Sequence, residues 1–206
     1  MMDCIPSSEE GIQKALDVLR SGGVVAHATE TCYGLACDIQ NPEAVARLFA
    51  IKQRSDDQPV SALFASVDQA QHYLEWNELA SQMAAEHFPG PLTIILPMKH
   101  NPPSILYVTP ITNNQSRITI GTRISSHPTA RTLIESFGSP LSTTSANIHS
   151  QPNTFSVEDI QKQFADVGHR PDLLLDDGPI AKSDASTVID ISEGVLHVLR
   201  KGSKTF

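Results

Sequence analysis

The segment Leu92–Pro97 places the strongest constraint on the fold, because it is almost entirely apolar. It follows a Pro-Gly-Pro turn, and a short continuous apolar run of this kind is typical of a strand that is buried on both faces. Similar apolar segments at 24–28 and 60–65 alternate with segments that carry helix signals. This alternation predicts an α/β fold in which helices flank a sheet. A Ser-Glu-Gly hairpin signal joins the segments 186–191 and 195–200, so we expect parallel and antiparallel strands in one mixed sheet.

Capping residues mark the helix starts. Ser7 and Glu10 have the spacing of a capping box, which predicts a helix over 7–20. Asn41, followed by a proline, predicts a second helix that ends near Arg54. Further helices are expected from Ser66, over 78–88, from His127 to Gly138 and from Ser156. Further strands are expected over 117–124 and 172–175, and a loop with a short strand near 105–108 is expected over 102–116.

The composition limits the classes of protein to which the chain can belong. Its 206 residues are 40% hydrophobic, and no linker or repeat divides them, so we expect a single domain over 1–206. The formal net charge of -8 argues against a strongly basic groove for a nucleic-acid backbone. No signal peptide is evident, and no apolar run approaches the roughly 20 residues that span a bilayer. We therefore expect a cytoplasmic protein without a membrane segment, and the three cysteines predict neither a disulfide framework nor a zinc site.

Several familiar catalytic motifs are missing from the sequence. It has neither a Walker loop nor a dinucleotide-binding turn, and it lacks the Gly-x-Ser-x-Gly and His-Glu-x-x-His motifs. The polar residues that remain as candidates are mostly cations and hydroxyls: Thr29, Thr31, Lys52, Arg54, Thr119, Arg123, Ser145, Asn147, Ser186 and Arg200. Such a set suits the binding of polyanions better than proton transfer. Phosphoryl or nucleotidyl transfer fits it, because positioning and charge stabilisation do most of the work in that chemistry.

Two pairs among these candidates also have a simple structural interpretation. Ser145 and Asn147 share one face if the end of the segment 141–147 is extended, and a hydroxyl and an amide there can bind a phosphate or a carboxylate. The alternative is a Ser/Thr-rich strand whose end makes ordinary turns. Lys52 and Arg54 lie where two cations usually complement a helix dipole. A shared site requires them to leave the helix in an extended conformation.

Six motifs follow one another in a fixed order. They are Ala28-Thr29-Glu30-Thr31-Cys32-Tyr33-Gly34-Leu35, Lys52-Gln53-Arg54, Pro89-Gly90-Pro91-Leu92-Thr93, Ser142-Thr143-Thr144-Ser145-Ala146-Asn147, Ser186-Thr187-Val188 and Leu199-Arg200-Lys201-Gly202. In this order and spacing, from about Ile12 to Gly202, the chain resembles the YrdC-like threonylcarbamoyl-AMP synthase family in its short, single-domain form. The resemblance implies a YrdC-like fold, in which a twisted mixed sheet with flanking helices has a concave ligand-binding face.

The resemblance also implies a reaction. Members of this family make threonylcarbamoyl-AMP and pyrophosphate from L-threonine, bicarbonate and ATP, and the product serves the threonylcarbamoyladenosine modification of tRNA. Mg2+ is implied together with ATP, although no ligand motif for it is present and no metal site on the chain is expected. The product would pass to the downstream tRNA threonylcarbamoyl-transfer machinery, and any direct contact with tRNA is expected to be weak. The alternative is a non-catalytic paralogue that binds nucleotide or RNA on the same face.

Matched position by position, the resemblance implies two sets of site residues. Lys52 and Arg54 are the expected catalytic residues. ATP would contact Lys52, Arg54, Thr119, Ser145, Asn147 and Arg200. Threonine would contact Thr31, Arg123, Thr143 and Ser186. The intact cations and the intact Ser-x-Asn pair favour the enzyme over the paralogue.

Some positions depart from the family pattern. His27-Ala28 stands in place of Tyr-Pro, Ser55 in place of a proline, and Leu63 where some members place a histidine. His149-Ser150 replaces the usual Ser-Gly after the Ser-Ala-Asn motif. We expect these changes to affect substrate preference or rate rather than the type of reaction.

Overall fold

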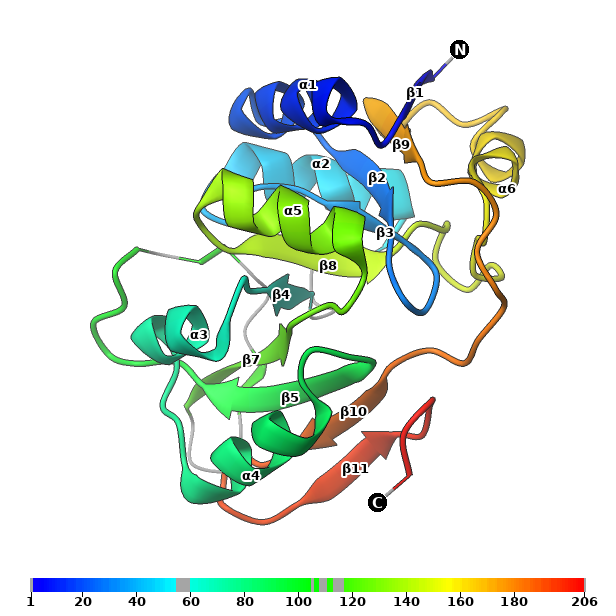
Figure 1. Cartoon of the computed structure of the whole chain (residues 1–206). Helices are drawn as coiled ribbons and strands as arrows, with labels where there is room; N and C mark the ends of the chain where they lie inside the picture. Colours follow the sequence, from blue (N-terminus) through cyan, green and yellow to red (C-terminus); the bar gives the residue numbers. More distant parts are fainter. Residues whose placement is uncertain (1, 55–59, 105, 108–110, 113–116, 206) are drawn as a thin grey trace.

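The computed structural model describes residues 2–54, 60–104, 106–107, 111–112 and 117–205. Within these residues, eleven strands form one twisted sheet that contains both parallel and antiparallel pairs (Figure 1). From edge to edge the strands are β1 (Asp3–Pro6), β9 (Leu173–Asp176), β2 (Val25–Ala28), β3 (Tyr33–Ala36), β8 (Leu141–Ser145), β4 (Ser61–Leu63), β7 (Ile118–Arg123), β5 (Leu92–Pro97), β10 (Thr187–Asp190) and β11 (His197–Arg200), and β6 (Ile111–Thr112) pairs with β7. The predicted mixed sheet is confirmed, as are the burial of β5 and the antiparallel hairpin of β10 and β11.

Helices cover both faces of this sheet. The described residues form α1 (Glu9–Arg20), α2 (Pro42–Lys52), α3 (Val67–Tyr73), α4 (Glu78–His87), α5 (Pro128–Phe137) and α6 (Val157–Gln163). Helices α1 and α5 lie on one face of β2 and α2 lies on the other (Figure 1). The side chains of β2 alternate accordingly, because Val25 packs in the cluster of Leu16 and Leu133 whereas Ala26 packs in the cluster of Leu48. None of the helices in the described part of the chain is long and apolar enough to cross a membrane.

The capping signals locate most of the helix starts. Asn41 and Ser66 accept hydrogen bonds from first-turn backbone N–H groups, as predicted. The prediction for α1 is wrong by one residue, because Ser8 rather than Ser7 caps this helix. Ser7 instead donates its backbone N–H to the carbonyl oxygen of Asp176 (3.1 Å) and so continues the pairing of β1 with β9.

Two short strands lie where the sequence pattern does not indicate them. Strand β1 precedes the first helix and pairs in parallel with β9. In the loop 102–116 the strand is β6, at Ile111–Thr112, and the prediction of a strand near 105–108 is wrong for the described residues Leu106 and Tyr107. Residues 105 and 108 lie outside the described part. Both missed strands are too short to show the alternation of apolar and polar residues that marks a strand. They are strands because they pair with β9 and β7.

Strand β8 brings distant motifs together. It runs antiparallel to β3 and to β4, so that Ser145 at its end lies opposite Gly34, and Thr143 lies opposite Ser61. After β8 the chain turns toward the end of α2, where the N–H of His149 donates to the carbonyl oxygen of Lys52 (2.8 Å). The first, second and fourth motifs of the sequence therefore meet at one place.

Asn41→Ala tests how far α2 depends on its cap. The side chain of Asn41 accepts from the N–H groups of Glu43 (3.0 Å) and Ala44 (3.2 Å). Losing both bonds should lower the free energy of unfolding by about 1 kcal/mol in a chemical denaturation experiment. Asn41→Asp keeps the acceptor and should stay close to wild type. An equal loss in both variants would contradict the capping role.

Candidate active site

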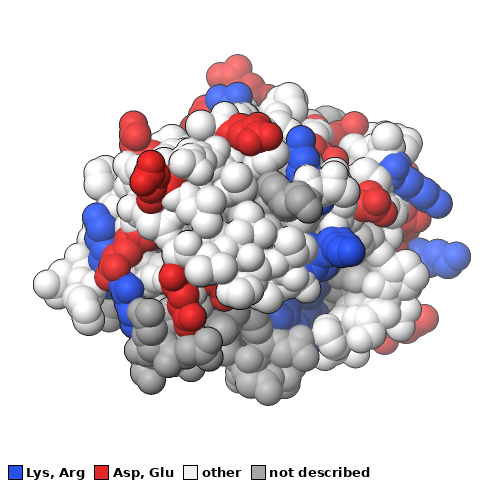
Figure 2. All heavy atoms as spheres, turned by 90° about the horizontal axis from the view of Figure 1, so that it is seen from below, with Lys and Arg blue, Asp and Glu red and all other residues white. Residues whose placement is uncertain are grey.

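A cavity of about 460 Å³ lies at the junction of these motifs. Nine of the ten predicted site residues line it: Thr31, Lys52, Arg54, Arg123, Thr143, Ser145, Asn147, Ser186 and Arg200. No acidic residue occurs among the described residues of its lining. Lys and Arg side chains gather around a hollow on the face of the molecule seen from below (Figure 2). A cavity with this lining favours anionic ligands.

The end of α2 directs two cations into the cavity. Gln53 has a left-handed backbone (φ 49°), and its N–H donates to the carbonyl oxygen of Ala50 (3.2 Å). The N–H of Arg54 donates to the carbonyl oxygen of Phe49 (3.2 Å). These bonds form a Schellman motif, which ends a helix by reversing the chain. The expectation of an extended segment is therefore corrected: Lys52 remains the last helical residue, and the left-handed turn brings Arg54 to the same cavity.

The ammonium group of Lys52 is buried and fully hydrogen-bonded. It donates to the carbonyl oxygens of Ser145 (2.6 Å) and Asn147 (2.9 Å) and to Oδ1 of Asn147 (3.0 Å). An ammonium has three hydrogens, so these acceptors use all of them. Burial, together with repulsion from the nearby Arg54, lowers the pKa of Lys52 to about 8. Lys52 therefore connects the end of α2 to the turn after β8 and adds a positive charge behind that turn.

The side chains of Ser145 and Asn147 point toward each other. The hydroxyl of Ser145 donates to Oδ1 of Asn147 (2.6 Å), and Nδ2 of Asn147 donates to the carbonyl oxygen of Gln151 (2.5 Å). The predicted proximity of the pair is thus present, although Asn147 lies in a turn beyond the end of β8 rather than in the strand. In this arrangement, Asn147 shapes the turn, and the Ser145 hydroxyl would have to rotate to donate to a ligand.

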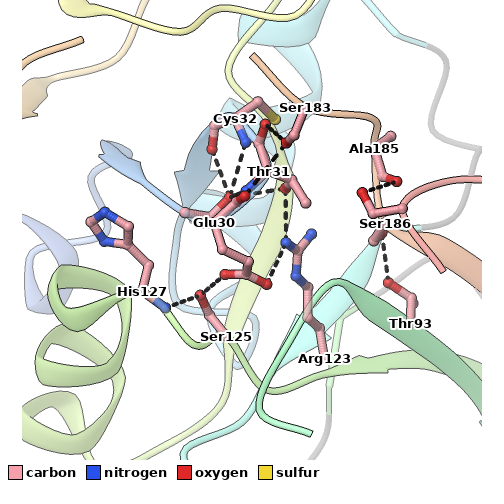
Figure 3. A network of polar contacts seen from close by, with 12 residues as sticks. Glu30, Thr31, Cys32, Thr93, Arg123, Ser125, His127, Ser183, Ala185 and Ser186 are labelled. Carbon is pink, nitrogen blue, oxygen red and sulfur yellow. Dashed lines mark hydrogen bonds and ion pairs between the residues drawn. The ribbon is translucent and has the colours of Figure 1, made fainter. Parts of the chain in front are cut away.

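A second polar network contains Arg123 and Thr31 of the cavity lining (Figure 3). Nη2 of Arg123 donates to Oε1 of Glu30 (2.9 Å) and to Oγ1 of Thr31 (2.8 Å). The hydroxyl of Ser125 makes a short hydrogen bond to Oε2 of Glu30. Burial acts to raise the pKa of Glu30, but Arg123 and the Ser125 hydroxyl outweigh it, so the pKa is lowered and the carboxylate is ionised at neutral pH.

The hydrogen bonds around Thr31 have a defined direction. The Thr29 hydroxyl donates to the carbonyl oxygen of Cys32 (2.7 Å), so at its 3.0 Å contact with the Thr31 hydroxyl it can only accept. Thr31 therefore donates to Thr29 and accepts from Arg123. With one lone pair used by Arg123, the Thr31 hydroxyl still has a lone pair for a ligand in the cavity.

Strand β10 and the end of β11 close a third side. The guanidinium of Arg200 donates from Nε to the carbonyl oxygen of Ser186 (3.0 Å) and from Nη2 to its hydroxyl (2.9 Å). The same hydroxyl lies 3.1 Å from Oγ1 of Thr93. A side chain at Gly121 would crowd the floor beside Thr93, because a Cβ there would lie 2.4 Å from Oγ of Ser61 and 3.0 Å from Cγ2 of Thr93. Gly121 thus leaves room for Ser61 and Thr93 in the lining of the cavity.

Thr119 is the predicted site residue that does not line the cavity. It lies on β7, on the same face as Gly121 and Arg123, and its side chain is buried. Its predicted contact with the nucleotide stays a prediction. Sequence reasoning in turn missed Glu30, whose position inside the first motif was the available signal, and it assigned no role to Ser125.

The departures from the family pattern differ in their relation to the cavity. His27 is buried in β2, its Nδ1 donates to the carbonyl oxygen of Ala28 (3.0 Å), and burial lowers the pKa of its ring to about 4. Leu63 packs in the core beneath α1 and α5. His149 and Ser150 line the cavity, and Ser150 has a left-handed backbone (φ 66°). Ser55 lies outside the described residues.

Comparison with known proteins identifies the family. The family model Sua5_yciO_yrdC, described as telomere recombination, matches residues 17–202. A curated threonylcarbamoyl-AMP synthase of Vibrio cholerae is 32% identical over 196 residues, which cover 94% of this chain and 98% of the relative. The chain belongs to the Sua5/YciO/YrdC family. A threonylcarbamoyl-AMP synthase of Mus musculus, another relative, is also 32% identical, over 94% of this chain and 67% of its own.

Solved structures of the Sua5/YciO/YrdC family share the fold. The crystal structure of P. abyssi Sua5 complexed with L-threonine has a TM-score of 0.83 at 30% identity, and the match covers 98% of this chain. The chain spans 57% of the length of that Sua5 protein. E. coli YciO matches with a TM-score of 0.82 at 26% identity, over the whole chain and 97% of YciO. The YrdC-like fold implied by the sequence is therefore confirmed.

The titration of Lys52 tests whether its ammonium group is buried as the structure shows. With a pKa of about 8, Lys52 is charged below this pH and neutral above it, where it loses one hydrogen bond to the turn after β8. NMR of lysine side chains should show one ammonium that titrates near pH 8. Lys52→Arg should remove this titration, because arginine stays protonated. A Lys52 signal that titrates at the usual pKa of an exposed lysine, about 10.4, would contradict the buried arrangement.

Ser150→Gly tests the strained loop beside the cavity. A left-handed conformation costs a residue with a Cβ roughly 1–2 kcal/mol, and glycine in the unfolded chain offsets about half of that gain. The variant should raise the free energy of unfolding by roughly 0.5 kcal/mol. Gly194→Ser, at φ 80° in the β10–β11 turn, is the reverse change and should lower it. A loss of stability in Ser150→Gly would show that the Ser150 side chain has a structural role.

Proposed function

We propose that this protein is a threonylcarbamoyl-AMP synthase that uses L-threonine, bicarbonate and ATP and releases pyrophosphate. One observation carries the proposal. Lys52, Arg54 and Arg200 line the same cavity as Arg123 and Thr31, in a chain whose curated relatives bear this name. The cavity therefore offers cations that can bind a triphosphate. Next to them it offers an arginine and a hydroxyl that can bind an amino acid.

The residue types suit this chemistry. The amine of threonine attacks the carbon of bicarbonate and forms a carbamate with loss of water. A carbamate oxygen then attacks the α-phosphorus of ATP while the bond to pyrophosphate breaks. A carbamate oxygen is already anionic, so the attack needs no strong base. It requires that the repulsion between carbamate and triphosphate be cancelled, which is the work of Lys and Arg side chains. The absence of any acidic side chain from the described lining agrees with this requirement.

We assign the two sides of the cavity to the two substrates. Arg54 and Arg200 would contact the ATP phosphates, and Ser145 would do so after rotation of its hydroxyl. Lys52 would act mainly by holding the turn of Asn147 and by its charge, because its three hydrogens are already used. These assignments rest on the described contacts and on charge.

On the other side, Arg123 would bind the threonine carboxylate, a pairing that guanidinium geometry favours. Thr31 would accept a hydrogen from the amine or the hydroxyl of threonine with the lone pair that Arg123 does not use. Thr143 and Ser186 line the same cavity and are also assigned to threonine. Because Ser186 accepts from Arg200, it lies where the amino-acid side meets the ATP side.

Mg2+ enters this proposal only as the companion of ATP. The described lining of the cavity offers no carboxylate, and no group of three or more metal-ligating side chains occurs among the described residues. These residues do not fit a resident metal, so we assign no step to one. We place the reaction in the cytoplasm, where the product would pass to the tRNA threonylcarbamoyl-transfer machinery. The net charge of -8 agrees with weak direct contact with tRNA.

The proposal is tested by following pyrophosphate in the presence of ATP, Mg2+, bicarbonate and threonine. Release should require threonine and bicarbonate together. Arg54→Ala should lower the rate by about a hundredfold or more, because a cation at the reacting phosphates is lost, with little change in thermal stability. Arg131→Ala is the matched control, since Arg131 is exposed and pairs with Glu135 on α5 (3.2 Å) away from the cavity. Pyrophosphate release without threonine would contradict the proposal and favour a nucleotide-binding paralogue.

A further inference from the structure

Glu30 is a buried carboxylate beside the cavity, and neither the motifs nor the proposed reaction gives it a role. It does not line the cavity, but its carboxylate faces the guanidinium of Arg123, which does (Figure 3). The side chains of Glu30 and Arg123 are 14% and 10% exposed, and their ion pair measures 2.9 Å. Burying an ion pair has a large desolvation cost, so the pair is a weak explanation for stability alone. This cost suggests that the pair serves the site.

The carboxylate of Glu30 is held from several elements. Its Oε1 accepts from Arg123 at the end of β7, and its Oε2 accepts from Ser125. The Ser125 oxygen in turn accepts from the N–H of His127 at the start of α5 (3.1 Å). The backbone beside Glu30 is also tied, because the Ser183 hydroxyl donates to the carbonyl oxygen of Thr31 (3.0 Å). Glu30 is therefore a fixed point against which Arg123 is oriented.

This contact determines how the guanidinium of Arg123 can be used. Both hydrogens of Nη2 are donated, one to Glu30 and one to Thr31. The plane of the guanidinium is thereby fixed, and its other amino nitrogen points away from Glu30 (Figure 3). Because Arg123 lines the cavity, this second nitrogen is the one that can meet a ligand there.

The charge of Glu30 also affects which ligand Arg123 favours. An ionised carboxylate at 2.9 Å cancels most of the long-range field of Arg123, while its remaining N–H groups can still make short hydrogen bonds. A zwitterionic amino acid depends on such short contacts. A polyanion such as pyrophosphate depends more on net positive charge. The pair is thus suited to an amino-acid carboxylate and unfavourable to phosphate groups.

We propose that Glu30 is a positioning residue that holds Arg123 for the threonine carboxylate and keeps polyanionic phosphates out of the amino-acid side of the cavity. This inference rests on the proposed function, because threonine is taken from it. Glu30 acts through Arg123 and does not touch the substrate.

Glu30→Gln removes the charge and keeps the size of the side chain. Threonine affinity, measured by calorimetry without turnover, should fall about tenfold, because the glutamine amide can still accept from Arg123 but the charge that strengthens this hydrogen bond is lost. ATP affinity should stay within about twofold. In steady-state kinetics the loss should appear in KM for threonine rather than in kcat, and pyrophosphate should become a competitive inhibitor against threonine. Glu30→Asp keeps the charge and should restore exclusion of pyrophosphate.

A double-mutant cycle separates positioning from a general loss of structure. In an Arg123→Gln background, Glu30→Gln should cause no further loss of threonine affinity, because Glu30 acts through Arg123. Asp172→Asn is the control for a lost ion pair away from the cavity, since Asp172 pairs with Arg47 (2.5 Å). It should lower stability without changing threonine affinity.

Two results would overturn the inference. One is that wild type and Glu30→Gln bind threonine with equal affinity. This result would overturn the inference while threonine-dependent release of pyrophosphate by the wild type still supports the proposed function. The other is a parallel loss of threonine and ATP affinity that follows the loss of thermal stability. Failure of the proposed function looks different, because the wild type itself would then show no threonine-dependent release of pyrophosphate.

Discussion

The buried ammonium of Lys52 is the interaction on which the architecture of the cavity depends. It lies at the end of α2 and donates to three oxygens of the turn that follows β8. The backbone of the same helix end accepts from His149, so the two segments are joined twice. A buried cation is unfavourable unless its hydrogen bonds are satisfied, and this conformation of the turn satisfies them. The contact thus stabilises the shape of the turn, while the left-handed backbone of Gln53 brings Arg54 to the same cavity.

The cavity has two electrostatically different sides. Around α2 and the turn after β8, positive charge is held by carbonyl groups, which supply dipoles and leave the charge in place. On the side of Arg123, the positive charge is paired with the ionised carboxylate of Glu30. The first arrangement suits phosphate groups, and the second suits the carboxylate of a zwitterion. A reaction that joins an amino acid derivative to a nucleotide needs both arrangements within one cavity.

Local signals account for much of the fold and for part of the site. The cap at Asn41, the apolar run of β5 and the turn at Gly194 each depend on a few neighbouring residues, and the structure agrees with them. Ser7 shows the limit of such signals. Ser7 and Ser8 are equally good caps by type, and only the pairing of Ser7 with Asp176 on β9 decides between them. In the site, similarity of motifs located nine residues that line the cavity, but it also included Thr119, which does not line it.

The sequence by itself determined the type of each long element, the mixed character of the sheet and the family, because these depend on local patterns and on motifs in order. Only the tertiary structure decided which groups touch. Glu30 and Arg123 are 93 positions apart, and Lys52 and Asn147 are 95 positions apart. Such contacts arise from the antiparallel register of β8 with β3 and from the reversal of the chain after α2. Hydrogen-bond direction and charge pairing depend on distances of a few ångströms, which no pattern of residue types along the chain specifies.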